Sequence, residues 1–141
     1  MWDEQIYEWR KQMDELQEEI KRLEGRADQC DDAYYRVKQD GHSYDEICDM
    51  QKVQALGICN DFSETEFAKY YGECAEQIFH GEKQKKILEI FEGVLESIRI
   101  QKNHIEDDIQ DLHKKITELE IQIEEAQRQR EVEQGSGKGD V

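Results

Sequence analysis

Apolar residues recur at alternating spacings of three and four in two long stretches of the chain. The first stretch runs from Ile6 to Val37 and the second from Leu88 to Ala126, and only Lys102 interrupts the second. A repeat of about 3.5 residues keeps an apolar stripe on one face of a helix only if that helix supercoils around a partner. The pattern therefore predicts two long helices, about residues 4–39 and 83–132, each with one apolar seam.

Neither long helix is expected to be stable with its seam in water, and the nearest partner is the other helix of the same chain. We therefore expect an all-α fold: a long antiparallel helical hairpin, or coiled coil, with short helices packed at its closed end. In the register that we expect, Ile6 is level with Ala126 and Val37 lies near Leu95. The same seams would also suit a homodimer, so closure within one chain or between two copies stays open.

The middle of the chain, about residues 43–80, predicts a shorter helical segment. Gly41 to Ser43 indicates a helix stop and restart, and a short helix through Leu56 is expected to follow. Ser63-Glu64-Thr65-Glu66 has the form of a capping box and predicts a helix that begins at Ser63. The inward positions that we expect across this middle segment are Tyr44, Ile47, Cys48, Met50 or Val53, Phe67, Tyr70 or Tyr71, Cys74, Ile78 and Phe79.

The 141-residue length suits one unit, which we expect to be a single helical-hairpin domain over residues 1–134. Proline is absent, so the strongest helix breaker is missing throughout. Residues 135–141 are rich in glycine and predict a flexible tail. At His80-Gly81 two possibilities stay open, because the preceding helix either bends there or continues straight into the last one.

The charge balance narrows the classes of partner. With 35 acidic and 19 basic residues the formal net charge is −16, which argues against direct nucleic-acid binding and against docking on anionic lipid. The N-terminus has no signal-peptide pattern, and no apolar stretch is long enough to span a membrane, so we expect a cytoplasmic protein. The four cysteines show no C-x-x-C spacing, which favours small buried thiols over a metal site.

The sequence offers no constellation for catalysis. In a di-iron helical bundle a glutamate stands three residues before each histidine ligand, whereas glutamine precedes all four histidines here at that spacing. Adjacent acids such as Asp107-Asp108 point about 100° apart on a helix and do not share a site. We therefore predict no catalytic, cofactor-binding or metal-binding residues, no cofactor, and a protein that is not an enzyme.

Aromatic residues and one lysine are the candidates for partner binding and for register. Most aromatic residues near the closed end are expected in the core, and any excess left exposed would be a docking surface. Lys102 on an apolar seam is expected to fix register by pairing with an acid, or to extend past the seam to solvent. The predicted partner-binding residues are Trp2, Trp9, Tyr35, Tyr44, Phe62, Phe67 and Tyr71.

The chain resembles the small helical-hairpin proteins of bacterial type VII secretion, the WXG-type superfamily, and especially the helical partners associated with LXG-domain toxins. The resemblance covers most of the chain and rests on two long seams around a helical middle, the aromatic turn from Asn60 to Phe67, and the aliphatic run from Ile98 to Ile123. It implies a targeting partner or chaperone for the helical N-terminal domain of a toxin, and export without a cleavable signal peptide.

Two other classes of function stay open. An acidic inhibitor, for example of the phage-encoded kind, would use its carboxylates to mimic a nucleic-acid backbone and to occupy the channel of a nucleic-acid-binding enzyme. A structural coiled-coil protein is the other alternative. Salt distinguishes mimicry from apolar helix packing, because only the mimic is expected to weaken steeply as ionic strength rises.

Overall fold

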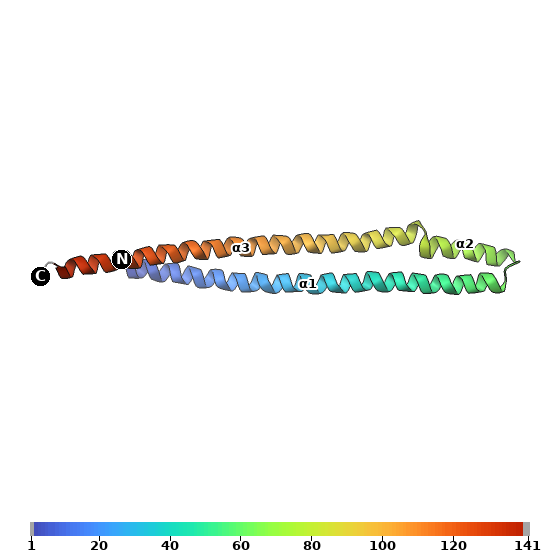
Figure 1. Ribbon diagram of the computed structural model, residues 1–141, viewed down its shortest axis with the longest axis horizontal. Coiled ribbons are helices and arrows are strands. Elements are labelled where there is room, and N and C mark those ends of the chain that lie inside the picture. Colours follow the sequence, from blue (N-terminus) through green and yellow to red (C-terminus); the bar gives the residue numbers. More distant parts are fainter. Residues whose placement is uncertain (1, 140–141) are drawn as a thin grey trace. The chain divides into compact units, whose positions relative to one another are not determined.

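The structure, a computed structural model, describes residues 2–139 and consists of three helices (Figure 1). They are α1 (Trp2–Asp61), α2 (Glu66–His80) and α3 (Glu82–Gly139), and the described residues form no strand. The predicted all-α class is confirmed for the described residues, and within each of the two units described below α1 packs antiparallel to the returning chain. One short helix, α2, takes the place of the several short helices that were predicted at the closed end.

The chain divides into two units. The terminal unit comprises Met1–Gln29 and Lys102–Val141, and the central unit comprises Cys30–Gln101. The first part of α1 and the last part of α3 therefore make up the terminal unit. The rest of α1, all of α2 and the beginning of α3 make up the central unit. The single domain predicted over residues 1–134 stays a prediction.

In the terminal unit the two predicted seams pack against each other. Ile6, Ile123 and Ala126 form a buried cluster, which confirms that Ile6 is level with Ala126. Trp2 and Trp9 pack against this cluster. The indole Nε1 of Trp2 donates a hydrogen bond to Glu133 Oε2 at 3.2 Å. The other buried seam residues of this unit are Ile20, Leu23, Ala27, Ile105 and Ile116.

In the central unit α1 packs first against α3 and then against α2 (Figure 1). The rings of Tyr44 and Phe91 lie with their centroids 6.1 Å apart, joining α1 to α3. Close to them the buried side chain of Gln84 donates a hydrogen bond from Nε2 to Asp45 Oδ1 at 3.2 Å. A buried amide that has a partner on the facing helix favours one register over its neighbours.

The predicted helix break between Gly41 and Ser43 is wrong, because α1 continues without interruption to Asp61. Gly41 has no positive φ, which a helix-ending glycine commonly adopts. Instead it faces a ring: a Cβ at this position would lie 3.4 Å from Cγ of Phe91. The glycine marks a close approach between α1 and α3, and the helix passes through it.

The capping box predicted at Ser63 does not form, and the N-cap of α2 is Thr65. Thr65 is extended, with φ −100° and ψ 148°, and its hydroxyl accepts a hydrogen bond from the backbone N–H of Ala68. The same hydroxyl donates to the carbonyl oxygen of Phe62 at 2.7 Å, which holds the turn closed. Phe62 and Phe67, on either side of this turn, are in contact, with ring centroids 5.2 Å apart.

The helix boundaries near the C-terminal part of the chain also differ from the prediction. The choice left open at His80-Gly81 is settled in favour of a break, because α2 ends at His80 and α3 begins at Glu82. A Cβ at Gly81 would lie 2.7 Å from the carbonyl oxygen of Gln77, so the break depends on a glycine there. At the other end α3 continues to Gly139, through most of the tail that was predicted to be flexible. Residues 140–141 of that tail lie outside the described residues.

Candidate functional site

The contact between α1 and α2 is made by small side chains. Ala68 and Ala75 of α2 are 2% and 8% exposed, and Cys48 and Ala55 of α1 are 2% and 3% exposed. The thiol of Cys59 lies against α2 as well, and it donates a hydrogen bond to the carbonyl oxygen of Ala68. Small side chains let two helices approach closely, but they leave the larger apolar side chains of both helices outside the contact.

This arrangement corrects the inward positions that were predicted for the middle of the chain. Of the predicted inward residues, Cys48 is buried and Tyr44, Cys74 and Phe79 are half-buried. The others point to water, because α2 packs against α1 through its alanines. These exposed residues are Ile47, Met50, Val53, Phe67, Tyr70, Tyr71 and Ile78.

The exposed apolar residues follow a regular second pattern. On α2 the inner positions are Ala68, Gly72, Ala75 and Phe79, and each is preceded by an apolar residue that is more exposed or similarly half-buried. On α3 exposed apolar residues precede Leu88, Phe91 and Leu95, and on α1 they precede Cys48, Gln51 and Cys59. Two buried inner positions interrupt this pattern, because the polar residue Gln54 precedes Ala55 and Lys83 precedes Gln84. We call the preceding apolar residues the outer stripe: Ile47, Met50 and Ile58 of α1, Phe67, Tyr71, Cys74 and Ile78 of α2, and Ile87, Ile90 and Val94 of α3.

Helix geometry places the outer stripe on one side of the central unit. A residue that precedes an inner position by one is rotated about 100° from it, in the same sense on every helix. Because α2 and α3 run antiparallel to α1, this shared sense of rotation turns all three stripes toward the same side. Residues that follow the inner positions by one must then lie on the opposite side.

An ion pair agrees with this assignment of the two sides. Lys52 of α1 follows the inner position Gln51, and Glu76 of α2 follows Ala75. The Lys52 Nζ and Glu76 Oε2 atoms lie 3.8 Å apart, so the two side chains meet across the helix pair. One side of the α1–α2 pair therefore carries a charged bridge, and the other carries the outer stripe, which has no charged residue.

The predicted partner-binding residues fall into three groups in the structure. Phe62, Phe67 and Tyr71 come together at the turn and along the outer stripe, and are 50%, 56% and 44% exposed. Trp2 and Trp9 pack on the core of the terminal unit. Tyr44 packs on Phe91, and Tyr35 is exposed elsewhere on α1. The structure therefore brings together three of the seven candidates.

The aliphatic members of the outer stripe were not among the candidates. Ile78 is 48% exposed, Ile90 65% and Val94 42%. The sequence-based candidates were all aromatic, so these aliphatic residues were not among them. Their signal in the sequence is the doubled apolar pattern at positions 67–68, 71–72, 74–75 and 78–79, and again at 87–88, 90–91 and 94–95. One apolar seam requires only one residue of each adjacent pair, so the second apolar residue indicates a second apolar face on the same helix.

Two side chains of the central unit have pKa values shifted by their immediate neighbours. Partial burial raises the pKa of the Tyr44 phenol above its ordinary value, and a hydrogen bond with the Cys48 side chain raises it further. A hydrogen bond from Arg99 lowers the pKa of the Glu96 carboxyl one turn earlier on α3. Both effects concern pairs on or beside the inner seam, and neither changes the charge of the outer stripe.

Lys102 makes an ion pair along its own helix. Its Nζ lies 3.6 Å from Glu106 Oε1, one turn further along α3. Its side chain is 32% exposed, so the ammonium group reaches past the seam far enough to keep contact with water. The role proposed for Lys102 in fixing register stays a prediction.

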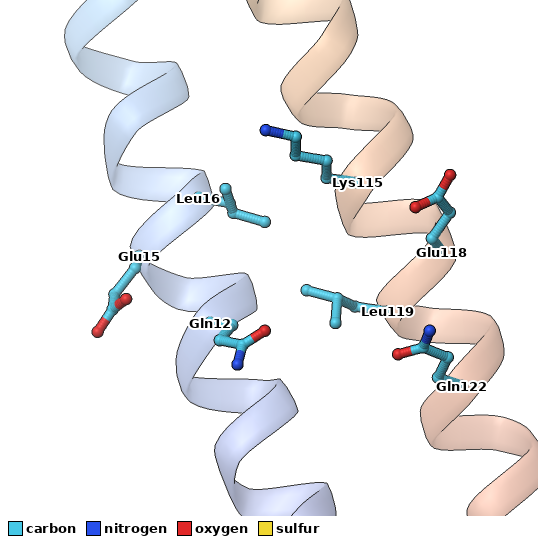
Figure 2. A pocket seen from close by; sticks show the side chains of 7 residues that line it. All are labelled: Gln12, Glu15, Leu16, Lys115, Glu118, Leu119 and Gln122. Atoms are coloured by element: carbon cyan, nitrogen blue, oxygen red, sulfur yellow. The ribbon is translucent and has the colours of Figure 1, made fainter.

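A cavity lies between α1 and α3 in the terminal unit. Figure 2 shows Leu16 of α1 and Leu119 of α3 pointing toward each other, between Gln12 and Gln122 on one side and Lys115 on the other. The cavity has a volume of about 360 Å³. The cavity lies at one level of the seam, between the facing side chains of the two helices. The amide and charged side chains that line it do not match the chemistry of any particular ligand.

Within residues 2–139 no group of three or more histidine, cysteine, aspartate or glutamate side chains is placed to hold a metal ion. No helix in this range is long and apolar enough to cross a membrane. Comparison with known proteins found no matching family model, no matching curated protein and no matching solved structure.

Proposed function

We propose that the protein is a non-enzymatic binding module that docks a second helical protein on the outer stripe of the central unit. The distribution of exposed apolar side chains carries this proposal. Of the nineteen large hydrophobic side chains that are exposed among the described residues, sixteen belong to the central unit, and nine of these sixteen lie on the outer stripe. Soluble proteins rarely leave such a set of apolar residues together on one surface unless another molecule covers it.

The energetics favour a helical partner. Full burial of an isoleucine or phenylalanine side chain contributes about 1.5–3 kcal/mol, and the members of the outer stripe gain only part of this in the free chain. Their spacing of three and four matches the spacing of the apolar residues on an amphipathic helix. A helix laid along the outer stripe can therefore insert its side chains between those of the stripe.

The resemblance to type VII secretion proteins supports a more specific form of the proposal. On that basis the partner would be the helical N-terminal domain of an LXG-type toxin, and this chain would act as its targeting partner or chaperone. Side-by-side helix packing would complete the assembly, as the resemblance implies.

Co-purification with matched variants tests the proposal. The tagged full chain is recovered from the cells that make it, as wild type, as Ile78→Glu and as Lys69→Gln. Both substitutions make the chain more negative by one charge, but Ile78 is on the outer stripe and Lys69 follows the inner residue Ala68 on the opposite side. We expect a stoichiometric helical partner with the wild type and Lys69→Gln, and at least a tenfold loss with Ile78→Glu.

Salt separates this proposal from acidic mimicry. At about 1 M salt the Debye length is about 3 Å, so contacts between exposed charges are screened while apolar packing persists. Retention of the partner in this wash supports docking on the outer stripe. Recovery of a nucleic-acid-binding enzyme that salt releases, equally from the wild type and Ile78→Glu, would contradict the proposal and support an acidic inhibitor.

A further inference from the structure

We infer that the partner helix carries one acidic side chain within its own apolar stripe, and that this acid pairs with Lys83 and sets the register of docking. The inference rests on the proposed function and names the chemistry that the partner brings. It follows from the position of Lys83 at the beginning of α3, in line with the apolar residues of the outer stripe.

Lys83 is in line with the outer stripe on α3. It directly precedes the buried inner residue Gln84. The members of the outer stripe that come next on α3 are Ile87, Ile90 and Val94, at spacings of four, three and four from Lys83 onward. Residues at these spacings share one face of a helix. A helix that covers the two isoleucines on this face therefore reaches the position of Lys83 as well.

The ammonium group of Lys83 forms no ion pair and no hydrogen bond with the described residues, and its side chain is exposed. The residues three and four positions further along α3 are Lys86 and Ile87, so its own helix offers no acid there. In the free chain water solvates the charge. A docked helix would remove that water, and burial of an unpaired charge is strongly unfavourable. A carboxylate on the docked helix offsets this penalty.

The inner seam shows how the chain accommodates a polar residue at the same level. Gln84 is a polar residue on an otherwise apolar seam, and Asp45 on the facing helix accepts its hydrogen bond at 3.2 Å. A polar side chain on such a seam selects the register in which it meets its partner. For Lys83 the facing residue comes from the docked protein. Aspartate or glutamate suits an ammonium group best, because it supplies both the opposite charge and a hydrogen-bond acceptor.

A second copy of this chain does not supply the acid from its own outer stripe. The positions that precede inner residues contain no aspartate or glutamate, either from Ile47 to Ile58 or from Phe67 to Val94. Two copies packed stripe against stripe would therefore offer Lys83 no carboxylate from the stripe. The occupant is a different protein, with an acid at one position of an amphipathic helix.

Three synthetic peptides test the inference on the full chain. Each is acetylated, amidated and about four heptads long, with leucine and isoleucine on one stripe and glutamine and alanine elsewhere. One central position of the stripe is glutamate in the first peptide, glutamine in the second and lysine in the third. Calorimetry gives their affinities for the wild type, Lys83→Glu and Lys85→Glu. Lys85 follows Gln84 on the opposite side of α3, so its variant is a control of equal net charge.

We expect the wild type to bind the glutamate peptide at least fivefold more tightly than the glutamine peptide. The ratio of the affinities for the glutamate and lysine peptides should be at least tenfold smaller for Lys83→Glu than for Lys85→Glu, because only the first variant reverses the charge that faces the peptide. A carbodiimide joins a carboxylate to an amine in contact with it. It should therefore cross-link the single carboxylate of the glutamate peptide to Lys83 of the wild type.

Equal affinity ratios in the two variants, or cross-links of the peptide only to other lysines, would overturn the inference. The proposed function would stand in that case if Ile78→Glu still weakened binding of all three peptides. Self-association of the chain that Ile78→Glu abolishes would identify a second copy as the occupant and overturn the inference as well. If no peptide binds the wild type, or if Ile78→Glu changes binding of neither the peptides nor the co-purified partner, the proposed function fails and the inference fails with it.

Discussion

The thiol of Cys59 donates a hydrogen bond to the carbonyl oxygen of Ala68, 3.2 Å away, and so joins the end of α1 to the first turn of α2. One turn further along α2, a Cβ added at Gly72 would lie 2.9 Å from the same sulfur. The close contact between these helices therefore depends on the absence of a side chain at Gly72 and on the position of Cys59.

A double-mutant cycle tests this dependence. We expect Gly72→Ala to lower the free energy of unfolding by about 1–2 kcal/mol in the wild-type background, because the helices must move apart. In the Cys59→Ala background the same change should raise the free energy of unfolding by up to about 1 kcal/mol, since alanine is the better helix former. Urea denaturation followed by circular dichroism gives both values, and equal effects in the two backgrounds would exclude the contact.

The buried cluster of the terminal unit gives a second prediction. Ile123 is 8% exposed beside Ile6 and Ala126, whereas Ile121 on the same helix is 51% exposed. We expect Ile123→Ala to destabilise the protein by about 2–4 kcal/mol, and Ile121→Ala by less than about 1 kcal/mol. Helix propensity changes equally in the two variants, so it cancels from the comparison. Similar losses from both would contradict the assigned seam.

Adjacent residues on α3 should separate stability from binding. Phe91 packs on Tyr44, while Ile90 belongs to the outer stripe and is 65% exposed. We expect Phe91→Ala to cost about 2–3 kcal/mol of unfolding free energy, because it removes an aromatic contact and leaves a gap. Ile90→Ala should leave stability within about 0.5 kcal/mol of the wild type but weaken partner binding several-fold. If Ile90→Ala lowered the free energy of unfolding and Phe91→Ala weakened only partner binding, the assignment of Phe91 to the inner seam and Ile90 to the outer stripe would be wrong.

Alkaline pH should destabilise the central unit through Tyr44. Burial raises the pKa of this phenol in the folded chain above the ordinary value of 10.0. The folded state therefore holds the proton more tightly than the unfolded state, and stability is lost as pH rises from the unfolded pKa through the folded one. We expect a late tyrosinate absorbance step near 295 nm that Tyr44→Phe removes. The same variant should show a smaller decline in unfolding free energy above about pH 10.

The part of the fold that depends on long-range periodicity was predictable from the sequence. The alternating spacings from Ile6 onward and from Leu88 onward specify two seams, and the cluster of Ile6 with Ala126 has the predicted register. The break at Gly41 was predicted wrongly because glycine was interpreted by its conformational preference alone. The spacing of three and four in fact continues through Val37, Gly41, Tyr44 and Cys48.

The candidate site was only partly predictable, because its location depends on which of two apolar stripes faces α1. Size alone favours Phe67 and Ile78 as inward residues over Ala68 and Ala75, and the structure has the opposite order. The choice is made by close helix approach at Cys59 and Gly72, which is a property of the packed pair. Sequence periodicity gives the spacing of both stripes but does not rank them.

Hydroxyl-radical footprinting of the chain, free and bound to its co-purified partner, tests the central claim most directly. Tyr71 on the outer stripe and Tyr7 in the terminal unit are 44% and 67% exposed in the free chain, so both should be oxidised. Partner binding on the outer stripe predicts at least a fivefold loss of oxidation at Tyr71 and at its neighbour Phe67, with Tyr7 unchanged. Protection of Tyr7 with Tyr71 and Phe67 still oxidised at their free rates would contradict the assignment of the outer stripe as the docking surface.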